Sequence, residues 1–484
     1  MEEFLSKIWY TYIQRQGVYD MNEDQILLYD HKKPISLRAK RVSFYLRGQI
    51  IEAFSETNEV YYLFFYKCNF LTAFKPTKLR RKSYIENAFK KGMVFNNDHP
   101  FIYPLLSANQ TLQMTSLKPL LKKLEKQYTP QEKTFILTFF ESFIPKKQLF
   151  AEIQTTFYEF RRNGQMLLGY QIVRILMDFA PKNSWVKNLA SDRSFSKLSV
   201  QYNEKSETLF AKDVIFAEKT LYGKKDDNRC FQQLVSSMEK ENRWIDLIAL
   251  YCFKLTKTPL NDYYTPLKTL LEKHFNETEI EFILAELAAK IPTFLPLQED
   301  LFNKYIEKKE IDKIINLMKN NELKLSHSQV LTMGEILSNS DLAGLAIDEK
   351  TFYTLMSPVI AMFPEKAEKL LTKYIITLLK TKELADIKTW LMPFKKNKNT
   401  LVLFEKIDLM QKLNEDLDEM QILGELYYEF KQFDKAIECF SWEMELDGSN
   451  PKPLQWLAKV YRELGMNYES DAYRQQCINL QKHA

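Results

Sequence analysis

The segments LGELYYEF, at residues 423–430, and LAKVYREL, at residues 457–464, repeat each other at a spacing of 34 residues. Their matched positions fall at i, i+1, i+4 and i+7, which lie in one stripe along an α-helix. The small residues Gly424 and Ala458 stand where a second helix would come closest to this stripe. Because a further amphipathic segment follows each stripe, the sequence predicts two helical hairpins over residues 417–484.

The spacing and residue types of these hairpins resemble the tetratricopeptide repeat, whose signature is L-G-x-x-Y, then A-x-x-x-F, then proline. The residues that carry the resemblance are Leu423, Gly424, Tyr427, Ala436 and Phe440 in the first hairpin, and Leu457, Ala458 and Tyr461 in the second. The second hairpin departs from the signature, because Ala458 replaces glycine and Ser470 replaces alanine. The resemblance implies an α-solenoid with a binding surface and not a reaction. A generic pair of amphipathic hairpins is the alternative.

Composition extends the helical expectation over most of the chain. The 484 residues include only 11 glycines, well below the usual frequency of roughly 7%, whereas tight turns and phosphate-binding loops depend on glycine. Fainter pairs of apolar stripes occur at residues 150–183, 228–261, 295–328 and 368–401. We therefore predict a mainly α fold, a solenoid of helical hairpins in which residues 105–416 form degenerate repeats that continue into the two repeats of 417–484. An irregular helical bundle over 105–410 is the alternative.

The first hundred residues follow a different pattern, which predicts a small basic α+β domain over residues 1–104. An amphipathic helix is expected at residues 1–16. Aromatic and β-branched runs then predict an antiparallel meander, with strands at residues 25–29, 35–46, 49–54 and 60–66. Nearly every residue of the last run is apolar, so we expect that strand to be covered on both faces, by the helix at 1–16 and a helix near 84–90.

The excess positive charge of the chain lies in this N-terminal region. The net charge is +5, and residues 1–110 hold 16 Lys and Arg against 11 Asp and Glu. The densest cluster comprises Lys75, Lys78, Arg80, Arg81, Lys82, Lys90 and Lys91, interleaved with Phe74, Tyr84 and Phe89. Basic clusters neutralise phosphates, and aromatic rings stack on unpaired bases. A solvated face is the simplest interpretation, with nucleic acid or an anionic membrane surface as alternatives.

The sequence carries no familiar catalytic or targeting signal. It lacks a glycine-rich phosphate loop, H-E-x-x-H and G-x-S-x-G. Its longest apolar run is about seven residues, against the roughly 20 that span a bilayer. Five scattered cysteines without a C-x-x-C pair are typical of reduced thiols. We therefore expect a cytoplasmic protein without catalytic residues, cofactor or metal. Asp98-His99 is an adjacent acid–histidine pair in a predicted loop, and neighbours on a loop usually point apart.

The resemblance to the tetratricopeptide repeat also implies which residues face a bound partner. In that family the first helix of each repeat lines a groove, and the residues between the packing positions point into it. The corresponding positions are Gln421, Glu425 and Tyr428 in the first repeat, and Lys452, Gln455, Trp456, Lys459 and Arg462 in the second. The surface is acidic on the first repeat, and basic and aromatic on the second. Tyr428 and Trp456 each belong either to this groove or to packing between the repeats.

These expectations combine into a non-enzymatic scaffold or adaptor that binds a protein or peptide segment in the groove. Two alternatives stay open: a peptide-sensing regulator whose basic N-terminal domain contacts nucleic acid, and an enzyme whose site lies within residues 1–104. The last helix ends without an obvious polar cap, so an apolar edge at Tyr473, Cys477 and Leu480 predicts self-association. Frequent lysine and asparagine indicate a bacterial source.

Overall fold

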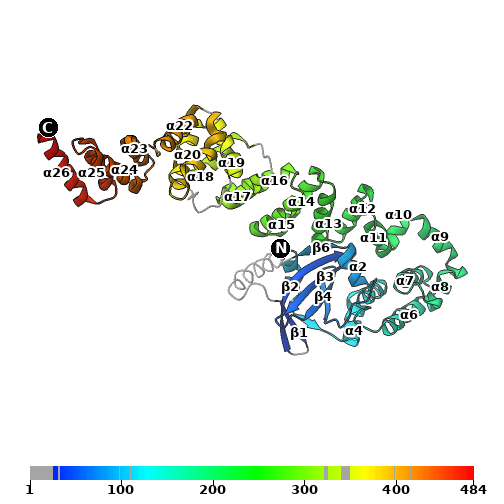
Figure 1. Cartoon of the computed structure of the whole chain (residues 1–484). Coiled ribbons are helices and arrows are strands. Elements are labelled where there is room, and N and C mark those ends of the chain that lie inside the picture. Colours follow the sequence, from blue (N-terminus) through cyan, green and yellow to red (C-terminus); the bar gives the residue numbers. More distant parts are fainter. Residues whose placement is uncertain are drawn as a thin grey trace, which may run out of the picture. The chain divides into compact units, whose positions relative to one another are not determined.

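The computed structural model describes residues 26–30, 33–96, 99–109, 111–205, 207–320, 325–339, 349–396, 398–414 and 416–483. The helix expected at residues 1–16 and Asp98 lie outside this part of the chain. Two compact units are formed, Met1–Ile291 and Pro292–Ala484. Within the described residues the helix content is 69%, in 25 α-helices, and a sheet lies near the N-terminus (Figure 1). The expectation of a mostly helical chain with an N-terminal sheet domain is confirmed.

The sheet of the first unit is built on the antiparallel meander that the sequence predicts. Its strands are β1 (Ile26–Asp30), β2 (Lys33–Tyr45), β3 (Gly48–Ser55), β4 (Val60–Tyr66), β5 (Asn69–Phe74), β6 (Met93–Asn96) and β7 (Leu112–Met114). Strands β1 to β5 pair consecutively and antiparallel. In addition β7 pairs with β1 in parallel and β6 pairs with β2. The last three strands go beyond the predicted meander.

Strand β5 escapes prediction because the turn before it lacks the usual signal. Lys67 and Cys68 connect β4 to β5, and both adopt a positive φ, of 49° and 66°. Two-residue hairpin turns with this backbone usually carry Asn-Gly or Asp-Gly. Here distant side chains hold the turn: the Cys68 amide donates to Oε1 of Gln49 at 3.1 Å, and Nδ2 of Asn109 donates to the Cys68 carbonyl at 3.2 Å. Hydrogen bonds from residues distant in the sequence thus stabilise a positive-φ turn that usually requires glycine.

Strand β4 is buried from Tyr61 to Tyr66, in agreement with its apolar sequence. The ring of Phe64 meets that of Phe140 at 5.3 Å, and Tyr62 meets Phe89 of α2 (Tyr84–Lys91) at 6.1 Å. The neighbouring β5 is held by α4 (Leu117–Gln127), where Nζ of Lys123 donates to the Phe70 carbonyl at 2.7 Å. Segments after residue 104 therefore complete the packing of the sheet.

The other helices of the first unit follow one another along the chain. They are α3 (Ile102–Ser107), α5 (Pro130–Leu137), α6 (Lys146–Arg162), α7 (Met166–Phe179), α8 (Ser184–Ala190), α9 (Ser196–Glu204), α10 (Glu207–Lys212), α11 (Val214–Tyr222), α12 (Asn228–Lys240), α13 (Trp244–Lys257), α14 (Asn261–His274) and α15 (Glu277–Lys290). Helices α6 and α7 pack together in the predicted pair at 150–183, and α12 and α13 in that at 228–261. Gly164, between α6 and α7, has a φ of 69°, which glycine adopts without strain.

A buried cluster of charged side chains joins the sheet to helices α11 and α13. Arg47, in the turn between β2 and β3, contacts Glu218 of α11, with 2.9 Å between Nε and the carboxylate. Arg243, just before α13, donates to Glu218 at 2.7 Å and to Asp246 at 3.0 Å. Gln49 of β3 donates to the same Asp246 at 2.8 Å. We call Arg47, Glu218, Arg243 and Asp246 the buried ion cluster.

The members of the buried ion cluster compensate one another where water is absent. Each is at most 3% exposed. Burial would raise the pKa of Glu218, but the guanidinium groups of Arg243 and Arg47 lower it overall. Burial does raise the pKa of Asp246, although Arg243 opposes that shift. Because charges leave water at low cost only when they are paired, the β2–β3 turn and the α11–α13 segment depend on each other.

The second unit is helical throughout its described residues. Its helices are α16 (Leu295–Lys308), α17 (Ile311–Asn320), α18 (His327–Asn339), α19 (Glu349–Met362), α20 (Pro364–Leu378), α21 (Leu384–Leu391), α22 (Lys398–Leu413), α23 (Met420–Glu429), α24 (Phe433–Leu446), α25 (Lys452–Glu463) and α26 (Asn467–His483). Helices α16 and α17 pack together in the predicted pair at 295–328. At 368–401 the packing differs, because α20 contacts α19 and α22.

The four helices of residues 417–484 pack as two hairpins, α23 with α24 and α25 with α26. The stripe residues Leu423, Tyr427, Ala436, Phe440 and Leu457 are all buried. A Cβ atom on Gly424 would lie 2.6 Å from the ring of Phe440, so the two helices of the first hairpin touch at this glycine. In the second hairpin the hydroxyl of Ser470 donates to the carbonyl of Ala458 at 2.7 Å. Ser470, which stands where the repeat signature has alanine, thus forms a hydrogen bond that alanine could not form.

We predict that Gly424→Leu destabilises the C-terminal hairpins by about 1–3 kcal/mol, because the new side chain must displace the ring of Phe440. Urea unfolding combined with hydrogen exchange of α23–α26 would measure the change. Gly448→Leu is the matched control, since a Cβ atom there meets nothing within 4 Å. Equal protection of the two variants would show that Gly424 is not a helix contact.

We predict that Glu218→Gln lowers the free energy of unfolding of the first unit by about 3–5 kcal/mol, because it leaves two buried guanidinium groups short of a negative charge. The control is Glu59→Gln, which removes the exposed pair with Lys75 and should leave the unfolding midpoint unchanged. A Glu218→Gln protein as stable as the wild type would mean that the buried ion cluster contributes packing alone.

Candidate functional site

The eight residues expected to face a partner lie on α23 and α25, the first helices of the two C-terminal hairpins, and these helices contact each other. Gln421, Glu425 and Tyr428 form one stripe on α23. The positions 34 residues later, Gln455, Lys459 and Arg462, form the equivalent stripe on α25, with Lys452 and Trp456 beside it. Four of these side chains are exposed: Lys452, Gln455, Lys459 and Arg462. The other four, Gln421, Glu425, Tyr428 and Trp456, are partly buried. We call these eight residues the α23/α25 face.

Trp456 connects the two hairpins and still presents part of its ring to solvent. Its ring stacks on Phe440 of α24, with centroids 5.7 Å apart and an angle of 12° between the planes. It also meets the ring of Tyr428 on α23 edge-on at 5.2 Å. Nζ of Lys459 lies over this partly exposed ring, 4.1 Å from its centroid. Trp456 therefore packs against both helices of the preceding hairpin, and its role in binding a partner stays a prediction.

The charges of the α23/α25 face are unequally compensated. On α23, Gln421 donates to Glu425 at 2.7 Å, and the nearby Glu429 pairs with Lys406 of α22. On α25, Lys452, Lys459 and Arg462 have no carboxylate partner among the described residues. A partly exposed tryptophan thus has one of these unpaired cations over its ring. Such a surface is suited to a ligand that carries both an apolar and an acidic group.

The residues expected to form an apolar edge lie mainly within the last hairpin. The ring of Tyr473 stacks on that of Tyr461 at 5.4 Å, and the Cys477 thiol lies 3.7 Å from the carbonyl of Pro451. Leu480 is half-buried. Exposed positions of α26 between them are mostly polar, such as Arg474. Self-association through this helix stays a prediction.

In the N-terminal region the aromatic rings of the basic cluster are engaged by other side chains. Tyr84 is buried and stacks on Phe139 with centroids 3.8 Å apart, whereas Phe74 is partly exposed and stacks on Phe143 at 4.9 Å. Phe89, also partly exposed, lies under the guanidinium of Arg41, 4.3 Å from ring centre to Cζ. Because each ring already has a partner, base stacking would compete with these contacts, although the exposed Lys and Arg side chains around them can still contact phosphates.

His99 finds a partner far along the chain. Its Nε2 lies 3.2 Å from the carboxylate of Glu286 on α15, and its Nδ1 accepts a hydrogen bond from the Phe101 amide at 3.3 Å. Burial lowers the pKa of His99, although Glu286 opposes that shift. His99, Glu286 and Cys252 line one pocket, and burial raises the pKa of the Cys252 thiol to about 12. A neutral thiol is a weak nucleophile. Among the described residues no group of three or more His, Cys, Asp and Glu is placed to hold a metal.

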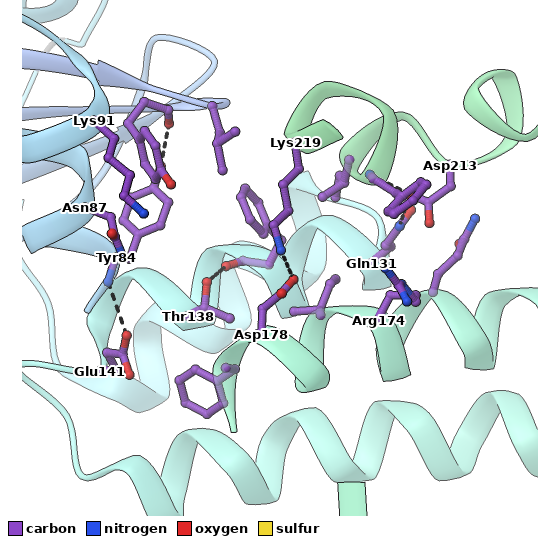
Figure 2. Close-up of a pocket in the computed structure, with 18 of the residues that line it drawn as sticks. Tyr84, Asn87, Lys91, Gln131, Thr138, Glu141, Arg174, Asp178, Asp213 and Lys219 are labelled. Atoms are coloured by element: carbon purple, nitrogen blue, oxygen red, sulfur yellow. Dashed lines mark hydrogen bonds and ion pairs between the residues drawn. The ribbon is translucent and has the colours of Figure 1, made fainter. Parts of the chain in front are cut away.

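Sequence reasoning missed a cleft in the first unit, of about 290 Å³, that is lined by α2, α5, α7 and α11 (Figure 2). Arg174 of α7 lies in it, together with Lys82, Lys91 and Lys219. These residues come from three separate segments, which extend from Lys82 to Lys219, and share no periodicity. The only sequence signal was the basic cluster, which supplies Lys82 and Lys91.

None of the helices in the described part of the chain is long and apolar enough to cross a lipid bilayer. No protein-family model matches the chain, and no curated protein matches it in sequence. The resemblance to the tetratricopeptide repeat therefore rests on the residues of 417–484 named above, and any function must be argued from the geometry of this molecule.

Proposed function

We propose that this protein is a non-enzymatic scaffold whose α23/α25 face binds an acidic segment of another protein. In this proposal α23–α26 are two tetratricopeptide-like repeats. The observation that carries it is the half-exposed ring of Trp456, with Lys459 over it and with Lys452 and Arg462 free of carboxylate partners nearby.

A tryptophan held in this way has the properties of an interface anchor. Contacts with Phe440 and Tyr428 restrict the rotamers of its side chain before any partner arrives. Binding then costs less side-chain entropy, and large aromatic residues are the commonest centres of binding energy at protein interfaces. The surrounding cations would attract acidic segments and reject basic ones.

The packing of the second unit supports a repeat architecture upstream of this face. The main helix contacts join each helix to the next one or two along the chain, as in α18 with α19 and α20, or α23 with α24 and α25. Contacts limited to near neighbours are typical of solenoids. We extend the proposal accordingly: the helical hairpins of the second unit form a solenoid that presents the α23/α25 face.

A nucleic acid partner for the basic N-terminal cluster is the weaker proposal. Lys78, Arg80, Arg81 and Lys82 are exposed and could contact phosphates. Phe74 and Tyr84, however, already stack on Phe143 and Phe139, which weakens the base-stacking contribution that such sites use.

We predict that a photo-crosslinking amino acid at Gln455 captures a partner from the source cells, and that the crosslinked peptide is rich in Asp and Glu. Gln455 is exposed beside Trp456, so the substitution should leave the hairpins folded. The matched position is Trp442, an exposed aromatic residue on α24, outside the α23/α25 face. Mass spectrometry of the adducts identifies both the partner and its contacting segment.

We further predict that Lys459→Glu combined with Arg462→Glu abolishes this crosslink, because it reverses the charge of the face without removing a buried contact. Arg474→Glu combined with Lys482→Glu on α26 makes the same change in net charge and should leave the crosslink intact. Adducts that appear equally at Gln455 and Trp442, or that persist after the charge reversal on α25, would rule out the α23/α25 face as the binding surface.

A further inference from the structure

The cleft in the first unit combines aromatic walls with charged ends. Its apolar lining includes the rings of Tyr45, Tyr84, Phe135, Phe179 and Phe216. Figure 2 shows Arg174, Gln131 and Asp213 toward one end, Tyr84, Asn87 and Lys91 toward the other, and the pair of Asp178 and Lys219 between them. The volume of about 290 Å³ is close to the lower end of the range for small-molecule sites, roughly 300–1,000 Å³.

Arg174 is the unexplained group in this cleft. Its Nε is buried and has no hydrogen-bond partner among the described residues. The guanidinium lies beside the touching rings of Phe216 and Tyr202, with Cζ 5.0 Å and 5.5 Å from their centroids, and Nη1 is 3.9 Å from the sulfur of Met177. Rings and a thioether orient the cation, but they do not satisfy its N–H donors. A buried donor without an acceptor is costly, so an acceptor from outside the chain would stabilise this arrangement.

The acidic residues of the cleft are already engaged elsewhere. Asp213 accepts hydrogen bonds from Gln131 at 2.8 Å, from the Tyr202 hydroxyl at 2.6 Å and from the Phe216 amide at 3.0 Å. Glu141 accepts from the Tyr84 amide at 3.2 Å and pairs with Lys146, which lies outside the lining. Neither carboxylate forms an ion pair with Arg174.

Further positive charge is available along the cleft. Lys82 and Lys91 line its far end and have no side-chain ion pair among the described residues. Lys219 pairs with Asp178, but the two side chains are 44% and 58% exposed. Exposed pairs contribute little free energy, so Lys219 can turn to a bound anion at low cost.

We propose that this cleft binds a small organic anion, a flat apolar group that carries a phosphate or carboxylate, and that Arg174 is the residue that binds the anionic group. The planar guanidinium offers paired N–H donors with the geometry of phosphate and carboxylate oxygens. The aromatic walls accept the apolar part. Lys219, Lys82 and Lys91 supply additional positive charge at the centre and far end. This site is independent of the α23/α25 face.

Calorimetric titration of the full chain with phenyl phosphate, benzoate, inorganic phosphate and phenol tests the proposal. We expect saturable binding of phenyl phosphate or benzoate, weaker binding of inorganic phosphate and none of phenol. Tight binding of inorganic phosphate with no gain from the phenyl group would reassign the cleft to free phosphate and overturn the organic part of the proposal. An absence of saturable binding by all four probes would overturn the whole of it.

The matched variants are Arg174→Met, which keeps an unbranched apolar stem and removes the guanidinium, and Arg162→Met, at an exposed position on α6 outside the cleft. Arg174→Met should weaken binding of the anionic probe by about tenfold or more, and Arg162→Met should not. Circular dichroism verifies folding. Should Arg174→Met fail to fold, Arg174→Lys keeps the charge, loses the paired donors and should still weaken binding. Unchanged affinity in a folded Arg174 variant would disprove the role of this residue.

Discussion

The first unit depends on the pairing of Arg47 and Arg243 with Glu218 and Asp246, which are all removed from water. Each of these charges would be costly alone, so the β2–β3 turn cannot be packed correctly unless α11 and α13 are in place. Glu218 belongs to α11, which lines the cleft together with α2, α5 and α7. The buried ion cluster therefore anchors one of the helices that form the candidate anion site.

Local periodicity explains why the C-terminal hairpins could be predicted from the sequence. Gly424 and Phe440 lie 16 positions apart and meet within one hairpin. Their contact can therefore be predicted from the spacing of small and aromatic residues along the sequence. The eight residues of the α23/α25 face come instead from the resemblance to the tetratricopeptide repeat. The sequence left the packing role of Trp456 open, because its contact with Phe440 of the preceding hairpin depends on how two hairpins stack.

The N-terminal half shows what periodicity cannot supply. The meander was predictable from alternating and apolar runs, whereas β5 follows a turn without glycine that distant hydrogen bonds from Gln49 and Asn109 hold in place. The cleft was not predictable, since Lys91, Arg174 and Lys219 come from three helices. In the same way, the aromatic residues of the basic cluster looked available for stacking in the sequence, and only the fold shows that Tyr84 packs on Phe139.

The α23/α25 face and the cleft each place a cation beside an aromatic ring. The two cations differ in burial, and we expect the two sites to bind different ligands for that reason. Lys459 lies 4.1 Å from the ring centre of Trp456 and is exposed, so water satisfies its donors until a partner displaces it. Arg174 lies 5.0 Å from the ring centre of Phe216, and its Nε is closed off from solvent. A ligand there must supply an acceptor in a defined direction, because the protein cannot turn to water instead. We therefore expect the α23/α25 face to tolerate variation in its acidic partner, and the cleft to select strictly for the geometry of its anion.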